Sequence, residues 1–274
     1  MKDQAGKQSK DQSQNQFEVR LDGVHKSFQE GQAREHVLRG VSFDFPREKL
    51  TYILGSSGAG KSVLIKHILG LLRPDQGEVW VSGQNVNQLS RKELTQFRLR
   101  FGMLFQNSAL FDDMTVFENV AFPLLEHTSM SHAEIQVSVH RTLSLLGMKD
   151  GYNKFPSELS GGMRKRVGLA RAIIREPSIL LYDEPTTGLD PVTRRTVDEL
   201  IETLKRELRL TSIVISHDIP SALLLADHIA FLDRGRIIFS GTPEEFRVSE
   251  NSVIRSFVDA ERRFLNVFRS ERSE

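Results

Sequence analysis

The sequence predicts an α/β fold, in which a mostly parallel sheet carries helices on its faces. Three observations support this prediction. An apolar run at residues 50–54 is followed by a glycine-rich loop and by an apolar segment of helical density that ends before Pro74. A second apolar run, at residues 179–184, is continuous enough for a strand buried on both faces. Residues 113–149 have helical spacing with no β-rich segment, which indicates a helical subdomain inserted into the α/β core.

Length, composition and charge exclude several classes of protein. The 274 residues, 39% of them hydrophobic, suffice for one main domain with a small subdomain or tail. The 37 basic and 36 acidic side chains nearly cancel, so no nucleic-acid or anionic-membrane partner is expected from overall charge. The lack of cysteine excludes disulfides and thiolate metal sites. No apolar run reaches the ~18 residues of a membrane-spanning helix, so we expect a cytoplasmic protein that meets membranes through a partner.

The N-terminal region is expected to hold a polar tail and two strands. Residues 1–16 are rich in Lys, Gln, Ser and Asp and are predicted to be a disordered tail rather than a secretory signal. Apolar side chains alternate over residues 17–21, and residues 41–45 form a second predicted strand. Phe28 stands among polar residues between them. It is either a turn aromatic that covers a sheet edge or a platform on which an adenine ring stacks.

The loop after residues 50–54 fits the pattern G-x-x-x-x-G-K-S/T. It comprises Gly55, Ser56, Ser57, Gly58, Ala59, Gly60, Lys61 and Ser62, and Val63 follows it. The glycines let backbone amides turn toward phosphate oxygens, Lys61 supplies charge for the β- and γ-phosphates, and Ser62 offers a hydroxyl to Mg²⁺. The helix that follows directs its positive dipole end at the same anion. Strand, lysine, hydroxyl and helix in this order predict a nucleoside-triphosphate site.

The next segment is predicted to add two strands and a helix. A turn at residues 74–77 precedes a short strand at 78–81, and residues 91–100 form a polar, basic helix. Residues 103–106 are predicted to be an apolar strand that ends on Gln106. An isolated glutamine at a strand end is usually a loop residue, and its alternative role is to reach a metal ion or to sense the γ-phosphate.

A second anion-binding segment precedes a helix predicted at residues 164–175. Ser160 is a suitable N-cap, and Gly161 and Gly162 permit close backbone approach at the helix N-terminus. The segment lacks a lysine, a strand and a metal ligand of its own. It is therefore incomplete by itself.

The strand at residues 179–184 closes on two adjacent carboxylates. The C-terminal end of a parallel strand is where α/β proteins bind ligands. Asp183 is expected to hold Mg²⁺, and Glu184 to orient or deprotonate an attacking water. His217 follows a further buried strand at 212–216, where it is either structural or placed to touch a γ-phosphate.

The rest of the chain is predicted to close the fold. A helix spans 193–208, strands at 229–232 and 236–239 form a hairpin, and a short helix begins after residue 242. Residues 251–274 have the spacing of an amphipathic helix whose apolar face needs a partner. That partner is the protein's own core, a neighbouring subunit or a membrane surface.

The order of these motifs resembles that of the ABC (ATP-binding cassette) ATPases, over residues 17 to about 250. The resemblance implies an ATPase with the P-loop NTPase fold: a RecA-like core, an N-terminal antiparallel β-subdomain and a helical subdomain at about 108–175. Its implied cofactors are ATP and Mg²⁺. Two copies would pair head to tail, so that residues 160–162 of one chain cover the γ-phosphate held by the other.

The resemblance also implies a role for individual residues. The phosphates and Mg²⁺ would be held by Gly58, Gly60, Lys61 and Ser62, and Gln106 would be the Q-loop residue that reaches the metal. Phe28 would stack on adenine. Glu184 would be the catalytic carboxylate, Asp190 the D-loop residue and His217 the switch histidine. One position departs from the pattern. Val63 stands where these ATPases usually carry Thr, which removes one side-chain bond to phosphate.

A narrower resemblance is to the MlaF-type ATPases of Mla phospholipid transporters of Gram-negative bacteria. It is carried by residues 103–121 and 125–128 and by Met163 at the end of the second anion-binding segment. It implies an MlaE-like permease, contacted near residues 107–117, an MCE-domain protein in the same complex, and a peripheral position on the cytoplasmic face of the inner membrane. The alternatives are an ABC ATPase that serves another permease and a soluble regulatory or nucleic-acid-associated cassette.

Overall fold

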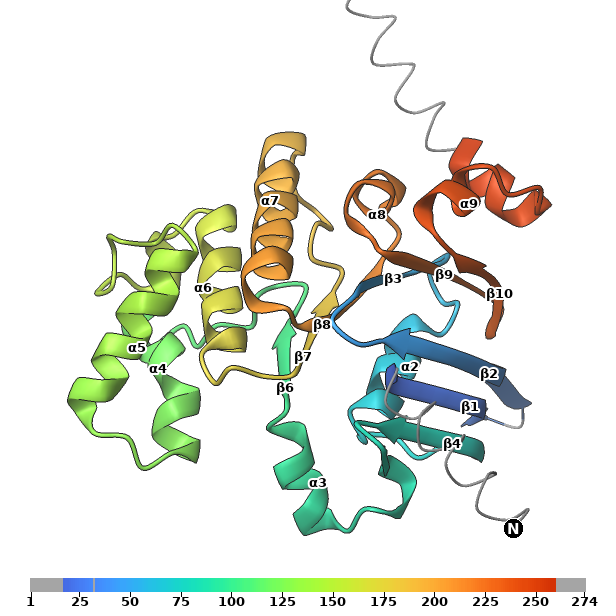
Figure 1. Ribbon diagram of the computed structural model, residues 1–274, viewed down its shortest axis with the longest axis horizontal. Helices are drawn as coiled ribbons and strands as arrows, with labels where there is room; N and C mark the ends of the chain where they lie inside the picture. Colours follow the sequence, from blue (N-terminus) through green and yellow to red (C-terminus); the bar gives the residue numbers. More distant parts are fainter. Residues whose placement is uncertain (1–16, 32, 260–274) are drawn as a thin grey trace, which may run out of the picture.

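The computed structural model describes residues 17–31 and 33–259, in which two sheets are flanked by helices (Figure 1). The larger sheet has six strands in the order β10-β9-β3-β8-β7-β6. They are β3 (Leu50–Leu54), β6 (Phe101–Leu104), β7 (Ile179–Asp183), β8 (Thr211–Ser216), β9 (His228–Asp233) and β10 (Arg236–Gly241). Every neighbouring pair is parallel except the β9–β10 hairpin at the edge. The α/β prediction is confirmed.

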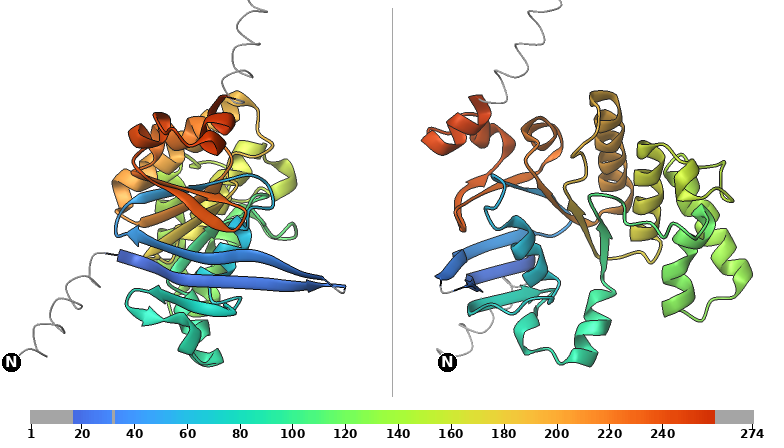
Figure 2. Two further views of the ribbon diagram at one scale, coloured as in Figure 1. Left: turned by 90° about the vertical axis from the view of Figure 1, so that its right-hand side faces the viewer. Right: turned by 180° about the vertical axis from the view of Figure 1, so that it is seen from behind.

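The smaller sheet is antiparallel and has the order β2-β1-β4-β5. Its strands are β1 (Phe17–Glu30), β2 (Ala33–Pro46), β4 (Gln76–Val81) and β5 (Gln84–Asn85). The first two form a long hairpin (Figure 2, left) that far exceeds the predicted strands, because backbone pairing continues through polar residues. Phe28 pairs with Glu35 inside this hairpin. Phe28 therefore lies in a strand and not in a turn.

Both faces of the six-stranded sheet are buried, since alternate side chains of a strand point to opposite faces. Helices α7 and α8 cover one face, and α2 and the four-stranded sheet cover the other (Figure 1). Tyr52 and Tyr182 belong to the core on the first side, and Ile53 and Leu181 to the core on the second. The helices of these layers are α2 (Lys61–Ile68), α3 (Arg91–Arg98), α7 (Pro191–Leu208) and α8 (Ile219–Leu225), with a 3₁₀ turn, η1 (Val86–Gln88), before α3. The sheet is thus the shared centre of two cores.

Three helices form a separate cluster beyond the β6 edge of the sheet (Figure 1). They are α4 (Val116–His127), α5 (His132–Leu145) and α6 (Gly161–Ile173), with the 3₁₀ turn η2 (Pro156–Glu158) before α6. Capping boxes begin α4, through Thr115 and Glu118, and α5, through Ser131 and Glu134. Since β6 and β7 are neighbours, the chain leaves the sheet, builds this cluster and returns to the adjacent position.

Several element ends differ from the predictions. The strand predicted at 103–106 is β6, which begins at Phe101, where pairing with β7 starts, and stops before Gln106. Gly102 lets α6 pack closely on this strand, because a Cβ there would overlap the Ala172 carbonyl oxygen. Ser160 caps α6 as predicted, so that this helix begins at Gly161 rather than at residue 164. Helix α7 also begins earlier than predicted, because Asp190 caps it. Helix α8 was not predicted, although its N-cap Asp218 was a usable signal.

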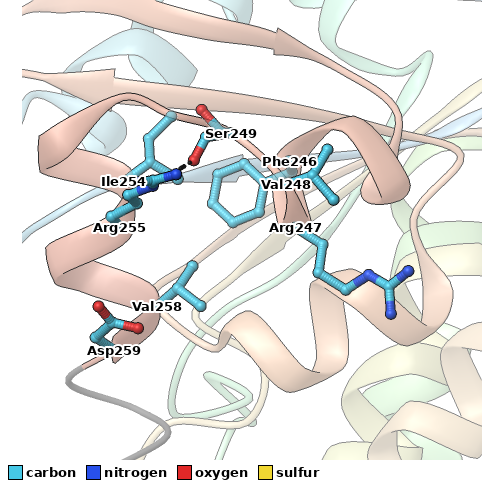
Figure 3. Close-up of a pocket in the computed structure, with 8 residues that line it drawn as sticks. All are labelled: Phe246, Arg247, Val248, Ser249, Ile254, Arg255, Val258 and Asp259. Carbon is cyan, nitrogen blue, oxygen red and sulfur yellow. Dashed lines mark hydrogen bonds between the residues drawn. The ribbon is translucent and has the colours of Figure 1, made fainter.

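The C-terminal part folds back on the core. After α9 (Pro243–Arg247), residues 252–259 are helical, and Ile254 and Val258 are buried in the main core with Phe246. These three side chains line a cavity of about 340 Å³, beside which Arg255 donates to the Ser249 carbonyl oxygen (Figure 3). The described part of the predicted tail helix therefore packs on the protein itself.

Two predicted segments fall partly or wholly outside the residues that the structure describes. They are the N-terminal tail at residues 1–16 and the portion of the predicted tail helix from residue 260 to 274. Among the helices of residues 17–31 and 33–259, none has both the length and the apolar character required to cross a bilayer.

Candidate active site

Four neighbouring parallel strands bring most of the predicted residues to one edge of the sheet. In the order β3-β8-β7-β6, they lead to the loop at residues 55–62, to His217, to Asp183 and Glu184, and to Gln106. Parallel strands end at the same edge, which is where α/β folds bind ligands. Side chains that are far apart in the sequence therefore become neighbours here.

The glycine-rich loop is held by the strands around it. A Cβ at Gly55 would overlap the Leu232 carbonyl oxygen at the end of β9, and one at Gly60 would lie 3.0 Å from Leu38 Cδ2 in β2. Gly60 has a φ of 106° and precedes α2 without a side-chain cap. The first amides of α2 are thus left for another acceptor, as at anion-binding helix N-termini.

Lys61 folds back over this loop. Its Nζ donates to the carbonyl oxygens of Gly55 at 2.7 Å and Ser56 at 3.0 Å, and lies 3.8 Å from Glu184 Oε1. The side chain is only 7% exposed. Burial lowers the pKa of Lys61, and the charges of Glu184 and Asp183 oppose this effect. The lysine therefore links the loop to the carboxylates at the end of β7.

Glu184 has an unusual backbone conformation and several partners. Its φ of 48° lies in the left-handed region, and its amide donates to the Ile215 carbonyl oxygen at 2.9 Å. Its Oε2 accepts from Thr187 Oγ1 at 2.8 Å and lies 2.9 Å from His217 Nδ1. A carboxylate next to a histidine at a phosphate loop suits the activation of water. His217, with 57% of its side chain exposed, remains open to a ligand.

The oxygen donors beside the loop fit Mg²⁺. Burial and the neighbouring Glu184 charge raise the pKa of Asp183, so a cation at this carboxylate would relieve an unfavourable charge. Ser62 presents an exposed hydroxyl at the start of α2. Within residues 17–31 and 33–259 no group of three or more His, Cys, Asp or Glu side chains could enclose a metal. Mg²⁺ commonly needs only one or two carboxylates with phosphates and water.

The second anion-binding segment lies apart from the loop. Ser160 Oγ accepts from the Met163 amide and caps α6, and a Cβ at Gly162 would lie 3.4 Å from Thr193 Cγ2 in α7. Residues 160–162 therefore adjoin the start of α7. Among the described residues, no hydrogen bond or ion pair joins them to residues 55–62.

Of three other predicted site residues, Asp190 caps a helix, whereas Phe28 and Gln106 are exposed. Asp190 Oδ1 accepts from the amides of Val192 and Thr193, both at 3.0 Å, and so caps α7. The Phe28 ring is 38% exposed, with the Lys26 ammonium 5.7 Å from its centroid. The Gln106 side chain is exposed, beyond the end of β6.

Residues that were not predicted hold the loop around Gln106. Lys165 of α6 is only 4% exposed and donates to the Gln106 carbonyl oxygen; burial lowers the pKa of this lysine to about 8. Arg171 Nη2 donates to the carbonyl oxygens of Ser108 at 2.9 Å and Ala109 at 2.7 Å. The Asn119 amide nitrogen donates to the carbonyl oxygens of residues 111, 114 and 115. Nothing in the sequence distinguishes these side chains from solvated ones.

A groove of about 480 Å³ lies beside this loop, between β6, α4 and α6. Its lining includes the aromatic side chains of Phe105, Phe111 and Phe122, of which the first two are 42% and 41% exposed. It also includes the basic side chains of Arg98, His127, Arg171 and Arg175, and none of the lining residues is acidic. The groove is therefore both apolar and positively charged.

Known proteins resemble this chain over most of its length. A family model described as ABC transporter matches residues 38–187. The chain is 39% identical over 244 residues to the "Probable ribonucleotide transport ATP-binding protein mkl" of Mycobacterium leprae (strain TN), covering 89% of this chain and 69% of the relative. It is 40% identical over 223 residues to the "Intermembrane phospholipid transport system ATP-binding protein MlaF" of Escherichia coli (strain K12), covering 81% and 83%.

Solved structures show the same fold. The dimeric structure of MJ0796, a bacterial ABC transporter cassette, has a TM-score of 0.75 and 31% identity, covering 82% of this chain and 98% of that one. A second dimeric structure of MJ0796, in a post-hydrolysis state bound to ADP and Pi, has a TM-score of 0.74, with the same identity and coverage. CbiO1 of Clostridium perfringens, part of the cbiONQ transporter complex, has a TM-score of 0.79 and 29% identity, covering 93% and 99%.

Proposed function

Because this chain belongs to the ABC transporter family, we propose that it is the ATP-hydrolysing subunit that energises phospholipid transport between the inner and outer membranes of a bacterium. The observation that carries the ATPase role is that Glu184 contacts both Lys61, the first residue of α2, and His217, just beyond β8. The phospholipid cargo is supported by the similarity to MlaF, which spans most of both chains.

In the proposed mechanism, residues 55–62 hold the triphosphate and Glu184 activates water. The amides at the start of α2 and the Lys61 ammonium stabilise negative charge on the β- and γ-phosphates. Glu184 accepts a proton from a water molecule while the oxygen of that water bonds to the γ-phosphorus. The bond between the γ-phosphorus and the β,γ-bridging oxygen breaks, and ADP leaves with that oxygen. His217, hydrogen-bonded to Glu184, faces the transferred group. Mg²⁺ held by Ser62, Asp183 and Gln106 would neutralise phosphate charge.

We further propose that two copies pair head to tail around two ATP molecules. Residues 160–162 form a partly exposed helix N-terminus, of which Ser160 is the exposed residue, and they make no hydrogen bond to the phosphate loop of their own chain. In the pair they cover the γ-phosphate held by residues 55–62 of the other copy, with Asp190 beside the same junction. Phe28, exposed on the hairpin whose second strand packs on Gly60, stacks on the adenine ring.

The groove between β6, α4 and α6 is the proposed docking site for the membrane permease. The phenylalanine and arginine side chains that line it fit a segment that combines apolar and acidic side chains. Phe105 and Ala109, on either side of Gln106, line the groove, so a shift of this loop on ATP binding would move residues that contact the docked segment. We assign the segment to an MlaE-like permease in complex with an MCE-domain protein. The chain would then lie on the cytoplasmic face of the inner membrane.

Affinity purification of the full-length chain from detergent-solubilised membranes tests this assignment. We expect a multispanning permease and an MCE-domain protein to be recovered together, with phospholipid bound to the complex. Recovery of an unrelated permease, or of a complex that carries ribonucleotide in place of lipid, would contradict the phospholipid role and leave the ATPase role intact.

Matched variants test the docking groove in the same purification. Phe111→Ser and Arg175→Glu are expected to lose the permease while they retain ATP binding. The control is Val137→Ser, which removes a 69% exposed apolar side chain from α5, outside the groove. Equal recovery of the permease by all three variants would rule out the groove as the contact surface.

A further inference from the structure

Asp218 is a buried carboxylate directly beside the proposed hydrolytic residues. It follows His217 in the sequence and is only 7% exposed. Its Oδ1 accepts from the Ser221 amide at 3.2 Å and so caps α8, and its own amide donates to Ser216 Oγ at 3.0 Å. The mechanism described above assigns it no role, yet its position is fixed by contacts on both sides in the sequence.

The second oxygen of Asp218 reaches the loop that carries Glu184. Thr186 Oγ1 donates to Asp218 Oδ2 at 3.0 Å, and Thr186 is only 3% exposed. Arg194, in the first turns of α7, has its Nε 3.5 Å from the same oxygen. Asp218 therefore joins three segments that are distant in the sequence: the end of β8, the loop after β7 and the start of α7.

The loop after β7 needs such a support because its first residue is strained. Glu184 is a non-glycine residue in the left-handed region, a conformation that costs about 1 kcal/mol or more. Within the loop, the Thr187 amide donates to the Glu184 carbonyl oxygen at 3.3 Å, and the Leu189 amide donates to the Thr186 carbonyl oxygen, also at 3.3 Å. The Glu184 amide connects the first residue of this turn to Ile215 of β8, and the bond from Thr186 to Asp218 connects its third residue to the segment that follows the same strand.

We propose that Asp218 is a positioning residue for ATP hydrolysis, which through its hydrogen bond with Thr186 holds Glu184 in place beside His217. The proposal rests on the ATPase function proposed above. A carboxylate suits this task because its two oxygens accept two bonds in different directions, one from Ser221 and one from Thr186. Both bonds are shielded from water and so are not weakened by exchange with solvent.

A further bond ties this arrangement to the interior of α7. Ser221 Oγ donates to Asp198 Oδ2 at 2.8 Å, and Asp198 is itself buried. The start of α8, and with it Asp218, is thereby fixed to a long helix rather than to a flexible loop. The geometry of Glu184 and His217 thus depends on the packing of α7 and α8.

Steady-state ATP hydrolysis by Thr186 variants of the full-length chain tests the proposal. Thr186→Val removes the hydroxyl at nearly constant volume. It is expected to lower kcat at least about tenfold, because misplacing a catalytic group by ~1 Å lowers the rate up to ~100-fold. The KM for ATP should change by less than about twofold. Thr186→Ser keeps the hydroxyl and is expected to restore kcat to within about threefold of the wild type. Thr203→Val, which removes a hydroxyl bond on exposed α7 surface, is the control.

The outcomes separate this proposal from the function on which it depends. Full turnover by Glu184→Gln in the same assay would refute the proposed mechanism itself. If Glu184→Gln is inactive but Thr186→Val matches the wild type, only the role of Asp218 is refuted. Equal losses in Thr186→Val and Thr186→Ser would also refute it, because the hydroxyl would not matter. If Thr186→Val does not fold, Thr186→Ala removes the same hydroxyl with a smaller side chain. A kcat of Thr186→Ala equal to that of the wild type would refute the role of Asp218, and a loss of at least about tenfold would support it.

Discussion

Asp198→Asn is expected to stabilise the protein, and to do so more at pH 8 than at pH 5. Asp198 is 8% exposed, and its pKa is raised to about 6. Burial is the largest cause; the charges of Asp218 and Glu199 also raise the pKa, whereas the Ser221 hydrogen bond and Arg194 lower it. The charge of Asp198 also affects Tyr52 of β3, whose pKa is raised by burial first and by Asp198 second. Asparagine carries no charge and keeps an oxygen that can accept the Ser221 hydroxyl. The substitution therefore removes an unfavourable buried charge and spares the hydrogen bond.

The sign and the size of the stability change caused by Asp198→Asn follow from the linkage between proton binding and folding. Because the pKa of Asp198 is raised in the folded protein, its favourable contribution is complete below its unfolded pKa and is lost as pH rises through about 6. A shift from 3.8 to about 6 corresponds to roughly 3 kcal/mol at pH 8 and to about 1.5 kcal/mol at pH 5. The stability advantage of Asp198→Asn should thus grow by about 1 to 1.5 kcal/mol between these pH values.

Urea unfolding at pH 5 and pH 8, extrapolated linearly to water, measures this difference. Asp150→Asn is the matched control, since it removes the same charge from an exposed loop and should change stability by less than about 0.5 kcal/mol. An Asp198→Asn protein that is less stable than the wild type at pH 8 would refute the argument. So would an advantage that does not change with pH.

Three further substitutions test the proposed site. Glu184→Gln should retain ATP binding and lose about 10²- to 10⁴-fold in kcat, as for removal of a general base, measured by nucleotide binding and phosphate release; undiminished turnover would exclude Glu184 as the base. Phe28→Ala should raise the Kd for ATP by roughly 5- to 150-fold, from the ~1–3 kcal/mol of base stacking, and should affect GTP and ATP alike; an unchanged Kd would exclude the ring as a platform. Gly55→Ala should abolish nucleotide binding and lower Tm, because its Cβ would overlap the Leu232 carbonyl oxygen; normal binding by a folded variant would show that the loop can shift.

The phosphate loop and the two carboxylates were predictable because their signals are local. A strand, a glycine-rich turn, a lysine and a helix are contiguous, and so are the apolar residues of β7 with Asp183 and Glu184. The approach of His217 to Glu184 was also within reach, because buried parallel strands end at the same edge of a sheet. Local order together with one rule of topology thus assembled most of the candidate site.

Other features depend on packing that a single sequence does not reveal. The burial of Lys165 follows from the approach of α6 to the Gln106 loop, whereas lysine in a helix is usually solvated. The bond from Thr186 to Asp218 joins residues 32 positions apart, and neither belongs to an apolar pattern. The hairpin of Phe28 extends through polar residues because backbone pairing, which the alternation of side chains does not record, continues there.

The central claim, that each ATP site is shared between two copies, is tested most directly by mixing two inactive variants. Lys61→Ala disables the phosphate loop. Gly162→Asp puts a negative charge where the γ-phosphate would lie, in a first-turn position where Asp favours the helix. Each variant alone should be inactive. An equimolar mixture should recover roughly a quarter of wild-type activity, because half of the pairs are mixed and each mixed pair has one intact site. A mixture as inactive as its components, or full activity of Gly162→Asp alone, would contradict the account.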